Sequence, residues 1–83
     1  EIMTSFAIYP NPTWNNVTLE FKNEDHQSRP LVFLFNDQGN LVQKIDNIKT
    51  DIVHLNLNEY PAGLYTICVQ QGSKRTQKRI LKF

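Results

Sequence analysis

The stretch Asn58-Glu-Tyr-Pro-Ala-Gly-Leu-Tyr-Thr-Ile-Cys-Val69 decides the fold, because it combines a tight turn with the β-strand that follows it. Pro61 restricts its own φ, and Gly63 is free to adopt the positive φ that tight turns often need. From Leu64 onward, large and smaller or mixed side chains alternate, which is the period of a strand. We therefore predict a core-facing set and an opposite, partly covered set: Tyr65, Ile67 and Val69 against Leu64, Thr66 and Cys68.

The segment after this strand is predicted to return as a second strand. Gln70–Ser73 is a turn, and Arg75–Phe83 then completes a C-terminal hairpin. Five of the nine cations fall in the last ten residues, and no acidic residue follows Glu59. Such a basic segment suits an anionic partner, although a solvated strand face is the simpler interpretation.

The chain is long enough for one small domain. A domain of 83 residues buries only about 60% of the surface of its unfolded chain, so its stability is marginal. One cysteine forms no internal disulfide, and aromatic and branched residues must supply the core. No stretch approaches the ~18 apolar residues of a membrane span. We expect residues 1–4 to be the tail of a linker, and the chain to be the end piece of a longer protein.

Upstream, short alternating segments are separated by turns. Pro10-Asn11-Pro12-Thr13 is predicted to leave the sheet as a rigid elbow, since two prolines remove two backbone donors. Turn signals recur about every 8–12 residues, with no helical periodicity. The predicted strands are Ser5–Tyr9, Val17–Phe21, Leu31–Phe35, Leu41–Ile45, Asp51–Leu57, Leu64–Val69 and Arg75–Phe83. This pattern indicates an all-β, seven-stranded antiparallel immunoglobulin-like β-sandwich, with a small barrel as the alternative.

Side chains suited to catalysis do not converge in the sequence. His26 lies in an acidic loop with Glu24 and Asp25, but these neighbours are sequential and do not make a metal site. His54 is expected to point outward from its strand, and Cys68 is expected to be a packed structural thiol. We predict no enzyme activity, no metal and no cofactor.

Trp14 is the one aromatic with a binding interpretation. Beside the elbow it is predicted to cover one end of the sandwich, and the alternative is a stacking platform for a sugar or base. Nucleic acid is not expected as a partner, since only Phe83 places an aromatic among the C-terminal cations.

The order of these turns and strands is more distinctive than any catalytic motif. The chain reads Phe6-x-Ile8-Tyr9-Pro10-Asn11-Pro12, Val17-x-Leu19-x-Phe21, Phe35-x-x-x-Gly39-x-Leu41-Val42, Leu57-x-x-x-x-x-Gly63-Leu64-Tyr65-x-Ile67-x-Val69, Gly72 and Lys78-Arg79-Ile80-Leu81-Lys82. Over residues 6–83 it resembles the type A C-terminal sorting domain of the type IX secretion system of Bacteroidetes. We expect residues 5–83 to form that domain.

The resemblance implies a secretion signal at the end of a larger cargo. The cargo would cross the inner membrane by a signal peptide and leave the periplasm through the outer-membrane translocon. It would then be secreted or held at the cell surface, in many members after a sortase removes the domain and joins the cargo to lipopolysaccharide. The expected partners are the translocon and sortase components and the cargo itself. An adhesive or glycan-binding module of a secreted protein is the alternative.

The resemblance also assigns roles to residues of this chain. The elbow residues would shape the turn after the first strand, three glycines would set other turns, and Tyr65 would anchor the core. Lys78 and Lys82, on one face of the last strand, would be the exposed cations that a receptor reads. The full predicted recognition set is Pro10, Asn11, Pro12, Gly39, Gly63, Tyr65, Gly72, Lys78, Arg79, Ile80 and Lys82.

Overall fold

The computed structural model describes residues 5–22 and 30–83. This part of the chain forms seven strands: β1 (Ser5–Tyr9), β2 (Asn16–Lys22), β3 (Leu31–Phe35), β4 (Leu41–Ile45), β5 (Ile52–Asn56), β6 (Gly63–Gln71) and β7 (Lys74–Lys82). Each predicted strand is therefore present, with ends that differ by at most a residue or two. Within these ranges, no helix is long and apolar enough to cross a membrane.

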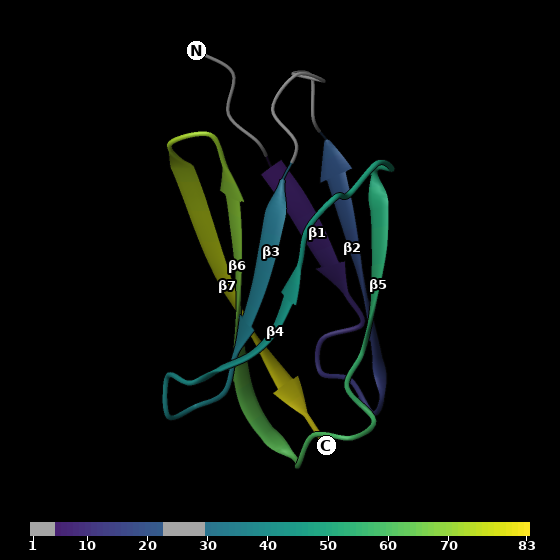
Figure 1. Cartoon of the computed structure of the whole chain (residues 1–83). Coiled ribbons are helices and arrows are strands. Elements are labelled where there is room, and N and C mark those ends of the chain that lie inside the picture. Colours follow the sequence, from purple (N-terminus) through teal and green to yellow (C-terminus); the bar gives the residue numbers. More distant parts are fainter. Residues whose placement is uncertain (1–4, 23–29) are drawn as a thin grey trace.

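The strands form two antiparallel sheets that face each other (Figure 1). One sheet has three strands in the order β1-β2-β5, and the other has four in the order β4-β3-β6-β7. This is the arrangement of an immunoglobulin-like sandwich, with strands exchanged between sheets after β2 and on either side of β5. The predicted sandwich is confirmed, and because the two sheets stay separate the barrel alternative is wrong.

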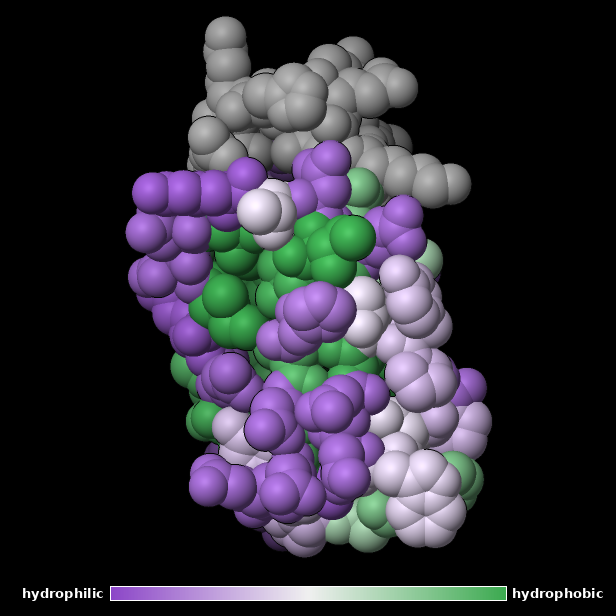
Figure 2. Space-filling model, turned by 90° about the vertical axis from the view of Figure 1, so that its right-hand side faces the viewer, coloured by the Kyte–Doolittle hydropathy of each residue, from purple (hydrophilic) through white to green (hydrophobic). Residues whose placement is uncertain are grey.

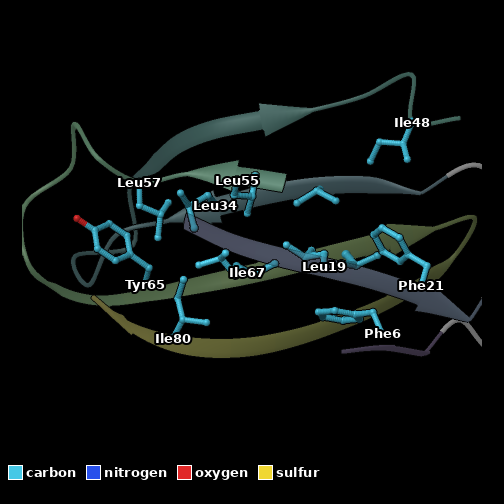
Figure 3. Close-up of a cluster of buried hydrophobic side chains, with 13 residues drawn as sticks. Phe6, Leu19, Phe21, Leu34, Ile48, Leu55, Leu57, Tyr65, Ile67 and Ile80 are labelled. Atoms are coloured by element: carbon cyan, nitrogen blue, oxygen red, sulfur yellow. The ribbon is translucent and has the colours of Figure 1, made fainter. Parts of the chain in front are cut away.

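The core lies between the sheets and is built by strand alternation (Figure 3). Val17, Leu19 and Phe21 of β2 point inward and are nearly inaccessible to solvent. The opposite sheet contributes side chains from β3, β6 and β7, and Ile48 enters from the β4–β5 connection. The buried apolar set is Phe6, Val17, Leu19, Phe21, Val32, Leu34, Ile48, Leu55, Leu57, Tyr65, Ile67, Val69 and Ile80.

Strand β3 is central, but only one of its faces is fully covered. Val32 and Leu34 point into the core, whereas Phe33 and Phe35 are half-buried on the outer side of the sheet. Their rings stack at 6.4 Å, and Lys44 of β4 lies over Phe33. The apolar run of this strand therefore supplies the core with one face and a partly exposed aromatic surface with the other. Cys68 pairs with Phe33 across the sheet and is 0% exposed, so the predicted packed thiol is confirmed.

Tyr65 ties the start of strand β6 to the turn that precedes it. The ring is in the core next to Tyr60, and its hydroxyl donates to the Pro61 carbonyl oxygen at 2.5 Å. A tyrosine that bonds backward from the start of this strand is the tyrosine corner of immunoglobulin-like domains. Figure 3 shows the Tyr65 oxygen at the end of the core, directed away from the other labelled side chains. The predicted core position of Tyr65 is thus confirmed.

The side of the sandwich along β4 and β5 is only partly closed. These strands belong to different sheets and do not pair, and they carry the partly buried Val42, Ile45 and Val53. Viewed from the side of β5, apolar residues come to the surface in the upper half of the molecule (Figure 2).

The linker predicted for residues 1–4 and the acidic loop with Glu24, Asp25 and His26 lie outside the described residues.

Candidate recognition surface: the elbow and strand β7

Strand β7 presents two chemically different sides. It pairs with β6 along its whole length, and Tyr65 lies opposite Ile80. That pairing turns Ile80 into the core, and the side chains of Lys78 and Lys82 leave the strand on the same inward side. The odd-numbered residues, Arg75, Gln77, Arg79 and Leu81, lie on the outer side and are exposed.

Lys82 is therefore not the exposed cation that was predicted. It is 8% exposed, and its ammonium group donates to the Tyr60 carbonyl oxygen at 2.8 Å. Its position beside Ile80 on the inward side places the aliphatic stem along the core, while the charged end reaches a backbone carbonyl at the end of the sandwich. The error came from the assumption that a lysine on a terminal strand faces water.

Lys78 is exposed, as predicted, but its ammonium group is engaged. It donates to the Phe6 carbonyl oxygen at 2.6 Å and lies 4.8 Å from the centre of the Phe6 ring. Phe6 is on β1 in the opposite sheet, so this one side chain joins the edges of both sheets. A carbonyl and an aromatic face both favour a cation, which holds Lys78 across the edge instead of extended into solvent.

The elbow docks on the free edge of β7. The Asn11 side chain behaves as a peptide group: its amide donates to the Arg79 carbonyl at 3.1 Å, and its oxygen accepts from the Leu81 N–H at 3.1 Å. Thr13 then continues with backbone bonds, donating to the Leu81 carbonyl and accepting from the Phe83 N–H, both at 2.9 Å. The bridge formed at Lys82 is parallel. In Figure 1 the β1–β2 connection and the end of β7 lie at the same, lower end of the sandwich.

Thr13 is a structural residue that the sequence analysis missed. It is buried, and its hydroxyl donates to the Asn16 carbonyl oxygen at 2.6 Å while its backbone pairs with β7. Pro10 and Pro12, both preceded by cis peptide bonds, flank Asn11 and remain exposed. The rigid elbow was predicted from these prolines, but its docking site lies almost 70 residues away and leaves no local signal.

Trp14 does not cover the end of the sandwich. It is 72% exposed and packs against Phe83, with ring centres 5.0 Å apart. The prediction of a lid is therefore wrong, and the pair forms an exposed aromatic corner beside the elbow. The physical reason is that Thr13, not Trp14, turns toward the interior at the point where the chain meets β7.

A shallow hollow lies on the outer side of the four-stranded sheet. It has a volume of about 410 Å³ and is bounded by the β3–β4 turn on one side and by β6 and β7 on the other. Asp37 and Arg79 stand among its lining residues, with Phe35 and Leu64 as apolar parts. Arg79 is thus a predicted recognition residue with an exposed side chain, and it faces a surface of mixed polarity.

The predicted glycines occupy turns that require them. Gly39 and Gly72 have φ of 84° and 60°, in the left-handed region that an L-residue rarely adopts. Gly63 also has a positive φ, at the start of β6. These residues and Tyr65 hold the fold and do not share one surface, whereas the elbow residues, Lys78, Arg79, Ile80 and Lys82 are brought together around β7.

The described residues contain no group of three or more histidine, cysteine or acidic side chains placed to hold a metal ion. His54 is exposed on β5, as predicted, and its Nδ1 lies 3.1 Å from the Thr18 hydroxyl. The one described cysteine, Cys68, is buried in the four-stranded sheet, between Phe33 of β3 and Gln77 of β7.

Comparison with known proteins identifies the family of the chain. Curated proteins provide no match. A protein-family model described as a secretion system C-terminal sorting domain matches residues 7–82 and so includes the elbow, the tyrosine corner and β7. Domains of this kind act as signals rather than as enzymes, and they direct a larger cargo chain to the cell surface or the extracellular space. The chain belongs to the family of secretion-system C-terminal sorting domains and serves as a sorting signal for type IX secretion.

Proposed function

We propose that this domain is read by the type IX translocon in its folded form, after its cargo has reached the periplasm. Family membership supports the proposal, and so does the docked elbow, which joins the two ends of the signal into one surface. A surface sortase then removes the domain and joins the cargo to lipopolysaccharide. The domain itself is catalytically inert.

Within the predicted recognition set, we divide the residues by what they touch. Arg79 is the cation read directly, because its side chain is exposed on the outer side of β7. Pro10, Asn11 and Pro12 shape the elbow beside it, and Ile80 and Lys82 fix the side of β7 that faces out. Lys78 holds the edge together, while Gly39, Gly63, Tyr65 and Gly72 act indirectly by maintaining the turns and the core.

The test is export of a periplasmic reporter fused to residues 1–83 in a type IX-competent host. Removal of residues 78–83 is a poor probe by itself, since it also deletes Ile80 from the core and the partners of the elbow. Arg79→Gln leaves those contacts in place, because they use its backbone only. We expect loss of export with an unchanged melting temperature. Normal export of a folded Arg79→Gln reporter would contradict the assignment.

Glycan binding is the second candidate function, and the exposed Trp14–Phe83 pair is the observation that favours it. Aromatic faces at the surface are suited to stacking on sugar rings. Trp14→Ala separates the two functions. If the domain is an adhesin, the substitution abolishes glycan affinity measured by calorimetry and leaves export intact, whereas a sorting domain without glycan affinity gives no heat in either form.

A further inference from the structure

The free edge of β7 is covered in its second half only. β7 is an edge strand of nine residues, and Asn11 and Thr13 take the outward backbone groups from the Arg79 carbonyl to the Phe83 N–H. The same alternation directs the N–H and C=O of Arg75 and Gln77, and the N–H of Arg79, away from β6. Within residues 5–22 and 30–83 no partner is present for these groups.

The elbow shows how this edge accepts another segment. Thr13 pairs with it as a short parallel strand, and Asn11 replaces one peptide group with its side chain. An extended segment from another protein would continue that pairing upstream, along residues 75–79, where the described residues place no backbone partner. Unpaired edges are common sites for strand addition between proteins.

Charge selects the chemistry of the partner. Arg75 and Arg79 flank Gln77 on the outer side of the edge, all three are exposed, and no acidic residue occurs after Glu59. Asp37, across the hollow on the β3–β4 turn, is the carboxylate that lines the same hollow as Arg79. A second copy of β7 would set cations against cations at this edge, which disfavours self-association. The two arginines are best matched by carboxylates on those side chains of an added strand that lie beside them.

We propose that residues 75–79 of β7 are a strand-addition site for an extended, acidic segment of a partner protein. The inference rests on the proposed function, because it supplies the contact by which the export machinery holds the folded domain. Main-chain hydrogen bonds provide the attachment, and Arg75 and Arg79 provide the selection for acidic side chains.

A proline scan with a matched control tests the edge. Gln77→Pro removes an N–H that does not bond β6, so the sandwich should still fold. The free edge, however, loses one hydrogen-bond donor, and the proline ring obstructs an added strand at that position. His54→Pro makes the same change on the free edge of β5 in the other sheet. There Asp51 accepts from Phe21 and Leu57 donates to Asn15, so by alternation the N–H of residue 54 points away from β2. We expect the Gln77→Pro reporter to fold and stay in the periplasm while His54→Pro is exported. Equal export of both folded variants would overturn the proposal.

Binding of a defined peptide tests the strand-addition site independently of the export assay. The probe is an end-blocked peptide in which glutamate alternates with valine, and its control has lysine in place of glutamate. Amide exchange of the isolated domain should slow at Arg75, Gln77 and Arg79 when the acidic peptide is added, and stay slow throughout at Thr76 and Lys78, which pair with β6. Gln77→Pro should weaken the peptide about tenfold, the equivalent of one hydrogen bond at the upper end of its usual range.

The second variant keeps the backbone intact in case the proline does not fold. Arg75→Gln combined with Arg79→Gln should reduce both peptide affinity and its dependence on salt. No amide protection by the acidic peptide, or equal protection by the lysine control, overturns the strand-addition site. Protection together with failure of the unmodified reporter to leave the periplasm would instead count against the sorting function and leave the edge assignment supported.

Discussion

Three polar side chains of the hairpin end on backbone carbonyls that the sheets leave available. Lys82 reaches Tyr60, Lys78 reaches Phe6, and Tyr65 reaches Pro61. Each contact joins β6 or β7 to a different part of the chain, at a strand edge or at the turn before β6. Each of these residues therefore stabilises the molecule through a hydrogen bond at its periphery. Their substitution should lower the free energy of unfolding more than substitution of an ordinary polar surface residue does.

Lys82→Met tests the buried ammonium group. The methionine keeps most of the aliphatic stem but leaves the Tyr60 carbonyl without its donor. A hydrogen bond from a charged donor contributes about 1.5–3 kcal/mol, so we expect a loss of that order in the free energy of unfolding. Urea denaturation measures it. Arg75→Met is the control on the exposed side of the same strand and should change the free energy by at most about 0.5 kcal/mol. Equal losses in the two variants would show that Lys82 acts only as a surface cation.

Tyr65→Phe tests the tyrosine corner. The ring and its packing remain, and the bond to the Pro61 carbonyl is lost, which should cost about 0.5–1.5 kcal/mol by thermal or urea unfolding. Tyr9→Phe removes an exposed hydroxyl that bonds Glu20 and should leave stability nearly unchanged. An unaltered Tyr65→Phe domain would mean that the corner is held by ring packing alone.

The same tyrosine should make stability fall at alkaline pH. Burial raises the pKa of Tyr65 above its ordinary 10.0, and the charges of Asp37 and Tyr60 add to the shift. The folded state therefore holds the phenol proton more tightly than the unfolded chain, so this contribution is complete below pH 10 and is lost as the pH rises through the folded pKa. The stability difference between the wild type and Tyr65→Phe should shrink above pH 10. The pKa of Tyr9 is also raised, first by its bond to Glu20, so the comparison is best made in a Tyr9→Phe background.

Among the secondary-structure elements, the elbow is the segment whose role changed most between sequence and structure. Its two prolines predict a rigid departure from the sheet, and that much is local chemistry. The structure adds that Asn11 and Thr13 serve as a short strand for β7, so the first connection of the domain also protects the edge of its last strand. Lys78 ties the same strand to Phe6 of β1 in the opposite sheet, and within the described residues this side-chain contact leaves the outward backbone groups of residues 75–79 unpaired.

Asn11→Ala tests the elbow as an edge cover. The substitution removes one donor and one acceptor for β7, and the Leu81 N–H then depends on water. We expect about 1–3 kcal/mol of destabilisation and faster amide exchange at Leu81, with exchange at Thr76 changed only by the overall loss of stability. Asn40→Ala is the control, because Asn40 is an exposed turn residue that bonds Asn36 through its backbone N–H. Unchanged exchange at Leu81 would show that Thr13 alone holds the elbow.

Alternation along β7 predicted that Lys78, Ile80 and Lys82 share a side, but it did not predict which side faces the core. Each side of the strand carries one aliphatic residue among cations, Ile80 on one and Leu81 on the other. The choice is made by pairing with β6, which sets Ile80 opposite Tyr65 and Leu81 opposite Leu64. Strand β2 carries no such ambiguity, because its apolar residues Val17, Leu19 and Phe21 all share one phase, and all three are buried.

At the scale of the whole molecule, the small size of the domain limits the free energy that keeps the sorting signal folded. A domain of this length has a free energy of unfolding of roughly 4–12 kcal/mol, so one core substitution is a large fraction of the total. The hairpin that carries the recognition surface packs on the same core as β2 and β5. Recognition of a folded surface must then depend on residues that no receptor touches.

Leu19→Ala tests that dependence. Leu19 is fully buried on β2, in the sheet opposite the hairpin, and its truncation should cost about 2–5 kcal/mol. All residues of the elbow and β7 remain, yet we expect export of the reporter to fall as the temperature rises, in step with the folded fraction of the purified domain. Leu41→Ala, at a half-exposed position on β4, should leave both curves in place. Export of the Leu19→Ala reporter at a temperature where the purified domain is mostly unfolded would mean that the machinery reads β7 as a linear segment. The docked elbow and the buried lysine would then serve stability alone, because neither contact exists in an unfolded chain.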